Sequence, residues 1–268
     1  MSPPRNPALR YYGAKFRLGR WIASNFPPHI TYVEPFGGAA GVLLRKEPSP
    51  VEVYNDLDSG VVNFFRVLRE QPQALFRSVD RTPFAREEFD QAFEYHPNPL
   101  EDARRFFVSS WQGFGGSRHK STGWKIQRGL WEKSRANQLQ EWHSAKRNLV
   151  RVAWRLRDVQ IEHADALDVI RRFDTEQTLF YVDPPYPTDT RNVSWCKGAY
   201  AFEYSMADHT HLANLLCRIK GMAIVSTYPN PFYDQAFAGW VKLSTTSQTM
   251  NKTVATELIY LSPRAAEL

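Results

Sequence analysis

The chain of 268 residues has few cysteines and no long hydrophobic run, and these absences exclude several classes of protein. Cys196 and Cys217 are its two cysteines, and their spacing matches neither a disulfide framework nor a zinc site. No segment approaches the roughly 18 apolar residues of a membrane-spanning helix, and the N-terminus lacks the apolar stretch of a secretory signal. We therefore expect a cytoplasmic protein that neither spans a membrane nor needs a metal.

Positive charge is concentrated in one part of the sequence. The formal net charge is +6, yet residues 101–157 alone hold 13 Lys and Arg against 4 Asp and Glu. The same stretch contains five of the eight tryptophans. A local cluster of cations and aromatic rings favours an anionic partner, above all a nucleic acid.

Short β-rich runs alternate with longer helical patterns, which is typical of an α/β sheet protein. We expect seven strands, at residues 31–34, 51–54, 158–162, 178–182, 222–226, 240–245 and 255–261. Helical patterns fill most gaps, at residues 39–46, 57–69, 166–172 and 206–220. The last two strands leave no room for a helix between them and should pair antiparallel.

The interval from about residue 70 to residue 157 breaks this alternation. Its helical patterns, at residues 86–95, 100–111 and 134–156, surround a glycine-rich, cationic centre that we expect to form a loop or small hairpin. The sequence thus predicts a sheet domain made of residues 1–70 and 158–268, interrupted by an inserted helical domain of residues 71–157.

The segment LFYVDPPYP at residues 179–187 is an apolar strand that ends at Asp183. Ligands of open α/β sheets bind at the carboxyl ends of strands, which places Asp183 where chemistry is expected. Pro184 and Pro185 lack amide hydrogens and make the turn rigid, and Tyr186 offers a flat face on which a base could stack. The alternative is an ordinary proline turn with a capping aspartate.

Two further segments are typical of a cofactor site. In VEPFGGAAGVLL, at residues 33–44, a strand ends at Glu34 and a glycine-rich turn follows, which would let the backbone approach a ligand. Asp56 ends the next strand and suits the hydroxyls of a ribose, whereas Asp58 could equally cap a helix. Near the N-terminus, Lys15 could pair with a cofactor carboxylate or be a solvated surface lysine.

Five motifs together resemble the Dam-like DNA adenine N6-methyltransferase family of phages and bacteria. They are YYGAK, EPFGG, YNDLD, IEHADAL and DPPY, in the order of the family and over nearly the whole chain. The resemblance is weakest between about residues 70 and 157. It implies a Rossmann-like, seven-stranded S-adenosylmethionine-dependent methyltransferase sheet with a mainly helical inserted target-recognition domain.

The resemblance also implies roles for individual residues. Asp183 and the carbonyl of Pro184 would hold the target amino group, beside Pro185, and Tyr186 would stack on an adenine flipped out of double-stranded DNA. The residues implied for the cofactor, S-adenosylmethionine, are Tyr11, Lys15, Glu34, Phe36, Gly37, Gly38, Asp56 and Asp165. No metal is implied.

The basic insertion supplies the expected DNA contacts. Its leading candidates are Arg118, Lys120, Lys125 and Arg128. The insertion lacks the target-recognition pattern of the GATC-methylating members, so the recognition sequence stays open, as does a restriction-modification, phage or orphan role. We expect a monomer or weak dimer.

Other activities remain to be weighed against this one. Cytosine C5 methylation needs a cysteine nucleophile, and neither cysteine follows a proline in a plausible active-site loop. Cytosine N4 methylation uses the same acceptor chemistry and is the nearest rival. RNA or protein glutamine methylation fits less well, because related enzymes of that kind usually begin the PPY corner with Asn. A catalytically silent DNA-binding protein on the same fold is a further alternative.

Overall fold

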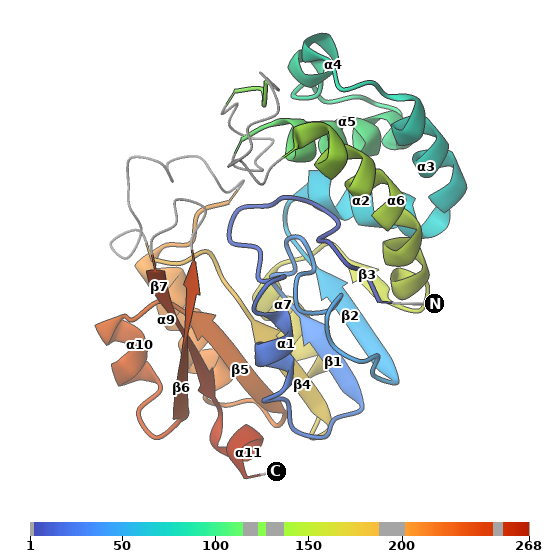
Figure 1. Ribbon diagram of the computed structural model, residues 1–268. Coiled ribbons are helices and arrows are strands. Elements are labelled where there is room, and N and C mark those ends of the chain that lie inside the picture. The colour runs from blue at the N-terminus through green and yellow to red at the C-terminus, as the bar shows by residue number, and fades with distance from the viewer. Residues whose placement is uncertain (1–2, 115–122, 127–136, 188–201, 249–253, 268) are drawn as a thin grey trace.

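The computed structural model describes residues 3–114, 123–126, 137–187, 202–248 and 254–267. Within them lies one seven-stranded sheet with helices on both faces (Figure 1). From edge to edge its strands are β3 (Gln160–Glu162), β2 (Val51–Asn55), β1 (Thr31–Glu34), β4 (Thr178–Val182), β5 (Met222–Thr227), β7 (Val254–Leu261) and β6 (Val241–Gln248). The mixed α/β fold predicted from the sequence is confirmed.

The direction of the strands follows the connections between them. The pairs from β3 to β5 are all parallel. By contrast, β7 runs antiparallel to both β5 and β6. The expected antiparallel pairing of the last two strands is therefore confirmed. The strand order reverses between β1 and β4, where an open α/β sheet leaves a crevice for ligands.

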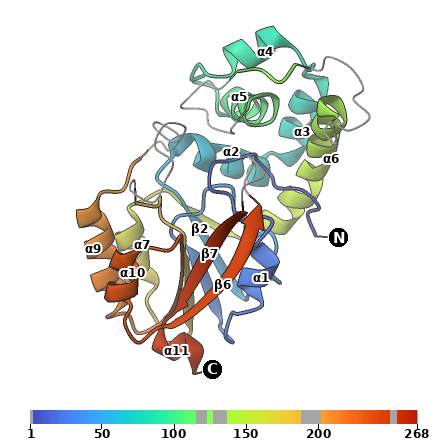
Figure 2. The ribbon, with the colours of Figure 1, turned by 60° about the vertical axis from the view of Figure 1, so that its left-hand side comes forward.

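Alternating side chains of the strands build two apolar cores. On one face, residues such as Tyr32, Tyr54 and Leu179 pack with α1 (Gly19–Ala23), α2 (Ser59–Glu70) and the helices that follow α2. On the other, Val33 and Phe180 pack with α7 (Ala166–Phe173), α9 (Met206–Leu216) and α10 (Pro231–Ala236). The view in Figure 2 separates these two helical layers. The short α11 (Pro263–Ala266) closes the chain beside β5.

Three of the predicted helices differ from the structure, one of them the helix expected at residues 86–95, which ends at Gln91. Residues 39–46 form successive turns instead of a regular helix, because Ala40 has a φ of 55°, which a right-handed helix cannot continue. The backbone hydrogen bonds after Ala40 do not keep the regular spacing of an α-helix. The amide of Leu44 donates to the Ala40 carbonyl, four residues earlier, but the amide of Arg45 donates to the Val42 carbonyl, three residues earlier. The helix expected at residues 206–220 ends at Leu216.

The predicted insertion contains α3 (Pro72–Arg81), α4 (Arg86–Gln91), α5 (Pro99–Gln112) and α6 (Gln138–Leu156), of which the sequence pattern missed α3. The core under α1 and α2 continues into α5 and α6 without interruption. The helices thus pack directly onto the sheet domain. The domain boundaries at residues 70 and 158 stay a prediction.

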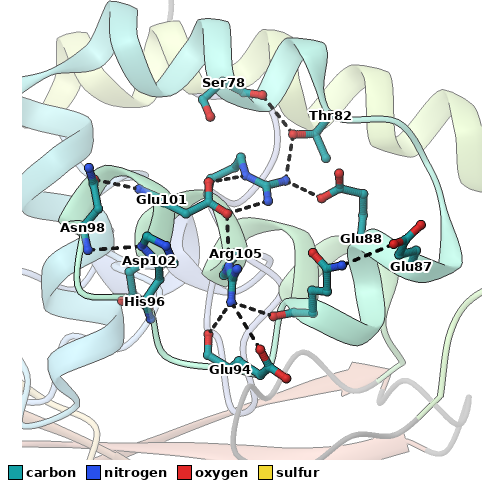
Figure 3. A network of polar contacts seen from close by, with 12 residues as sticks. Ser78, Thr82, Glu87, Glu88, Glu94, His96, Asn98, Glu101, Asp102 and Arg105 are labelled. Carbon is teal, nitrogen blue, oxygen red and sulfur yellow. Dashed lines mark hydrogen bonds and ion pairs between the residues drawn. The ribbon is translucent and has the colours of Figure 1, made fainter.

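Polar contacts fasten α3, α4 and α5 to one another (Figure 3). The guanidinium of Arg104, on α5, donates to Thr82 Oγ1 at 3.0 Å and to Glu88 Oε2 at 2.6 Å, so that it joins the three helices. Glu101, one turn earlier on α5, accepts from both Arg104 and Arg105. Asn98 caps the start of α5 by accepting from the amide of Leu100.

A buried ionic group joins α6 to the sheet. Arg155 donates to both carboxylate oxygens of Glu52 on β2, at 2.5 and 2.7 Å. Lys46 donates to the same carboxylate at 2.5 Å, and Arg155 also donates to the carbonyl of Leu43. Because these charged groups are shielded from water, their positions depend strongly on one another.

Candidate active site

A pocket opens at the carboxyl ends of β1, β2 and β4, where the strand order reverses. Each predicted cofactor residue lines it: Tyr11, Lys15, Glu34, Phe36, Gly37, Gly38, Asp56 and Asp165. Asp183 and Pro185 line the same pocket. Segments that are far apart in the sequence therefore meet in one cavity.

The glycine-rich turn after β1 is held in place by β2. The amide of Gly37 donates to the carbonyl of Asn55 at 2.7 Å, and a Cβ at Gly37 would collide with the buried ring of Tyr54. Gly38 has a φ of 47°, and its carbonyl accepts from the Tyr54 hydroxyl at 2.7 Å. Glycine is thus required at residue 37 by close approach and favoured at residue 38 by backbone conformation.

Asp56 and Asp58 have different tasks. Asp56 accepts from the amide of Gly38 at 2.7 Å and from that of Asp58 at 2.8 Å, and burial raises its pKa to about 6. Asp58 caps α2 through the amide of Gly60 and accepts from the hydroxyl of Tyr11 at 3.2 Å. The capping interpretation of Asp58 is confirmed, and Asp56 is the carboxylate fixed against the glycine-rich turn.

Glu34 is buried at the base of the pocket. Its Oε1 accepts from the hydroxyl of Tyr32 at 2.6 Å and from the amide of Leu43 at 2.7 Å. Burial raises its pKa to about 7, although these hydrogen bonds act in the opposite direction. This carboxylate therefore ties the end of β1 to the turns that follow it.

The rim of the pocket is formed in part by Asp165 and Phe36. Asp165 caps α7, accepting from the amides of Leu167 and Asp168. The ring of Phe36 meets the ring of Tyr204 edge to face, with centroids 5.4 Å apart. The rim thus combines one exposed carboxylate with an aromatic wall.

Asp183 follows β4 directly and carries the site's central carboxylate. Its Oδ2 lies 3.1 Å from the ammonium of Lys15. Its Oδ1 is buried and has no hydrogen-bond partner among the residues that the structure describes. Burial raises the pKa of Asp183, and the Lys15 ammonium opposes that rise.

Lys15 is buried between two carboxylates. Besides Asp183, its ammonium lies 3.7 Å from Glu257 Oε1, and it donates to the carbonyl of Gly13 at 2.9 Å. Burial alone would lower the pKa of Lys15, but Asp183 and Glu257 outweigh burial and raise it. The predicted pairing of Lys15 with a cofactor carboxylate stays a prediction.

Tyr186 is also buried, and its surroundings were not foreseen from the sequence. Its hydroxyl donates to Glu257 Oε1, its ring lies 4.7 Å below the ammonium of Lys15, and its edge contacts the ring of Tyr228. Glu257 sits in the middle of β7 and is 3% exposed. The sequence feature that could have indicated Glu257 is the presence of an acidic residue inside the apolar strand TELIYL.

Three of the four residues predicted to contact DNA, Arg118, Lys120 and Arg128, lie outside the described part of the chain. Lys125 is described and is buried, donating to the carbonyl of Trp111 at 2.9 Å, and burial lowers its pKa to about 7. A phosphate contact from Lys125 would thus require rearrangement. An antiparallel bridge joins Gly113 to Trp124.

One family model matches part of the chain. Residues 11–112 match the family model described as D12 class N6 adenine-specific DNA methyltransferase. A search of curated proteins gives no match. Within the described residues, no group of three His, Cys, Asp or Glu side chains is arranged to hold a metal ion. In the same part of the chain, no helix has the length and apolar character needed to cross a membrane.

Proposed function

We propose that the chain, whose residues 11–112 match the D12 class N6 adenine-specific DNA methyltransferase family, is a member of that family, and that its pocket binds S-adenosylmethionine beside a corner at Asp183 that holds the adenine amino group. The reaction of the enzyme is methylation of adenine N6 in DNA. The family match favours adenine over cytosine, and it favours an enzyme over a silent DNA-binding protein.

One observation carries the assignment of Asp183. Its Oδ1 is a buried acceptor that lacks a partner in the described part of the chain, while Oδ2 is held by Lys15. A buried acceptor left without a donor costs free energy, and an amino hydrogen of the substrate would supply the missing donor. Asp183 also lines the proposed cofactor pocket. The adenine amino group would therefore lie beside the methyl group of the cofactor.

The residues of the pocket fit the proposed cofactor chemically. The glycine-rich turn, which packs against Tyr54 at Gly37, lines the pocket, as in other nucleotide-binding turns. The Asp56 carboxylate suits a pair of ribose hydroxyls. Phe36 and Tyr11 offer apolar ring surface, and Asp165 lies at the rim. We assign these residues, with Lys15, Glu34 and Gly38, to cofactor binding.

The cofactor supplies a methyl group already activated by its sulfonium. The protein must then align the amine and stabilise the positive charge that grows on nitrogen. Asp183 Oδ1 and the Pro184 carbonyl would accept the two amino hydrogens and turn the nitrogen lone pair toward the methyl group, while Pro185 stiffens the turn. The carboxylate would also stabilise the developing cation.

An adenine must leave the duplex to reach this corner, at a cost of about a few kcal/mol. Stacking on Tyr186 would offset part of that cost. Tyr186 is only 5% exposed in the structure. Stacking of a base on it therefore requires the tyrosine or the residues that bury it to move.

We also assign target recognition to the helical insertion, residues 71–157, with Arg118, Lys120 and Arg128 as phosphate or base contacts. The excess of cations in residues 101–157 supports double-stranded DNA as the substrate, since a duplex carries about one negative charge per 1.7 Å. A monomer or weak dimer and a cytoplasmic location stay predictions from the sequence.

The test replaces Asp183 with Ala and with the isosteric Asn. We expect single-turnover methyl transfer to fall by at least about 100-fold in both variants, with binding of cofactor and DNA retained. Mass spectrometry of the digested DNA would identify N6-methyladenine as the wild-type product. Asp168→Asn, which removes an exposed carboxylate on α7, is the matched control. Normal turnover per bound complex in the Asp183 variants would overturn the assignment.

A further inference from the structure

A groove lies between the N-terminal segment and α6, on a part of the surface that the proposed site does not use. Arg5, Arg147 and Arg151 line it, and no acidic residue does. The other lining residues are Asn6, Ser144, Asn148 and Val150. This groove therefore gathers three guanidinium groups without a compensating negative charge in its wall.

The groove has a fixed floor. Asn6 Nδ2 donates to Ser144 Oγ at 2.8 Å, and the amide of Arg5 donates to Asn148 Oδ1 at 3.1 Å. Asn148 in turn donates to the carbonyl of Asn6 at 2.7 Å. These three hydrogen bonds hold the N-terminal segment along α6, so that Arg5 is presented beside the arginines of the helix.

The three guanidinium groups differ from the other cations nearby. Arg10 pairs with Glu141 at 2.5 Å, and Arg155 is bound to Glu52. The side chains of Arg5, Arg147 and Arg151 make neither an ion pair nor a hydrogen bond to any residue in the described ranges. Arg147 and Arg151 are one helical turn apart and so project from the same face of α6. Unpaired arginines in a row are suited to phosphate oxygens, which they bind through two parallel hydrogen bonds.

The groove is close to the proposed active site along the chain. The segment that supplies Arg5 continues to Tyr11, which lines the pocket. Six residues span at most about 22 Å even when fully extended. A base pair advances a duplex by about 3.4 Å, so the groove lies within the length of about six base pairs from the pocket.

We propose that this groove binds phosphates of the DNA backbone outside the target site, on one flank of the methylated adenine. This contact rests on DNA being the substrate and is independent of which residues hold the amino group. Phosphate contacts carry no sequence information themselves but fix the position of the protein on the duplex. The groove would thus extend the footprint of the enzyme beyond its recognition sequence.

The test uses the double variant Arg147→Gln/Arg151→Gln and a series of duplexes. The target adenine is placed with flanks of about 2, 5, 10 and 20 base pairs on one side, then on the other. We expect the wild-type affinity to rise by about tenfold once one particular flank is long enough to reach the groove, and the variant to lack that rise. On the long duplex, the slope of log affinity against log salt should become shallower by about 2 in the variant.

The control is Arg171→Gln/Arg172→Gln, which removes the same charge from exposed positions on α7. Arg5→Gln removes a cation of the groove without altering α6, and we expect it to weaken the same dependence on flank length. Equal losses in groove and control variants, or equal losses on short and long flanks, would overturn the proposal. Methyl transfer at saturating DNA should be unchanged in the groove variants, so that this outcome is separate from the test of Asp183.

Discussion

The ammonium of Lys15 lies 3.1 Å from Oδ2 of Asp183, whose other oxygen, Oδ1, has no hydrogen-bond partner in the part of the chain that the structure describes. The pair divides the carboxylate into one oxygen that is held by the protein and one that is available to a substrate. Lys15 belongs to the N-terminal segment and Asp183 to the turn after β4, so the acceptor is assembled by tertiary contacts.

Replacing Lys15 with Met should shift the pH dependence of methyl transfer. Burial raises the pKa of Asp183, and Lys15 opposes the rise, so loss of the cation should raise that pKa further and leave less carboxylate ionised at neutral pH. We expect the acid limb of the single-turnover rate to move to higher pH by about one unit or more. Lys15→Arg, which keeps the charge, should restore part of the wild-type profile. A rate lowered by the same factor at every pH would contradict a role for Lys15 in the ionisation of Asp183.

Glu257 should act as a positioning residue. It accepts from the Tyr186 hydroxyl and lies beside Lys15, so Glu257→Gln removes the charge but keeps an acceptor for the tyrosine. We expect the rate of methyl transfer to fall by about tenfold, while cofactor affinity is retained. Tyr186→Phe, which removes the same hydrogen bond from its other end, is the matched variant. A double variant whose loss equals the product of the single losses would show that the two residues act independently.

Binding of the cofactor should depend on the ionisation of Asp56. Burial raises its pKa to about 6, and the charged form is the better acceptor for ribose hydroxyls. Cofactor affinity measured by calorimetry should therefore weaken by about tenfold one pH unit below this pKa and level off above it. In Asp56→Asn the affinity should be lower and nearly independent of pH over this range. A flat wild-type profile would place the ribose contact on another residue.

The buried pair of Arg155 and Glu52 should contribute strongly to stability. Arg155→Met leaves Glu52 buried with Lys46 alone, and we expect the free energy of unfolding to fall by about 3 kcal/mol at pH 7. Burial would raise the pKa of Glu52, but Arg155 and Lys46 outweigh it and lower the pKa. The contribution is then present above the ordinary glutamate pKa and is lost as the pH falls through the lowered value. Denaturant unfolding at several pH values should show the wild-type advantage shrinking in acid; a constant difference would contradict this account.

The sheet was predictable because its strands have strong local signals. β4 is a continuous apolar run that ends in Asp183 and two prolines, and β1 ends in Glu34 before a glycine-rich turn. The periodicity of residues 39–46 predicted a helix, yet Ala40 has a positive φ, in a turn that hydrogen bonds at Gly37 and Gly38 hold against β2. Such tertiary constraints leave no trace in helical periodicity.

The residues of the candidate site were predictable where a motif contains them. Tyr11, Asp56 and Asp183 stand in short segments, and the structure brings them to one pocket. Glu257 and Tyr228 could not be placed in this way, because their contacts with Tyr186 join segments that are distant in sequence. The pairing of Lys15 with Asp183 likewise depends on the fold, since the lysine alone fits a surface position equally well.

The end of α2 and the start of the strand that follows the insertion meet closely in space. The guanidinium of Arg69 donates to the carbonyl of Val159 at 2.9 Å, although the two residues are 90 apart in the sequence. The chain therefore leaves the sheet after α2 and returns to it at β3 from a neighbouring position. A segment of another length between α2 and β3 could therefore be accommodated without altering the strand register, provided that it offers an apolar surface to cover α2.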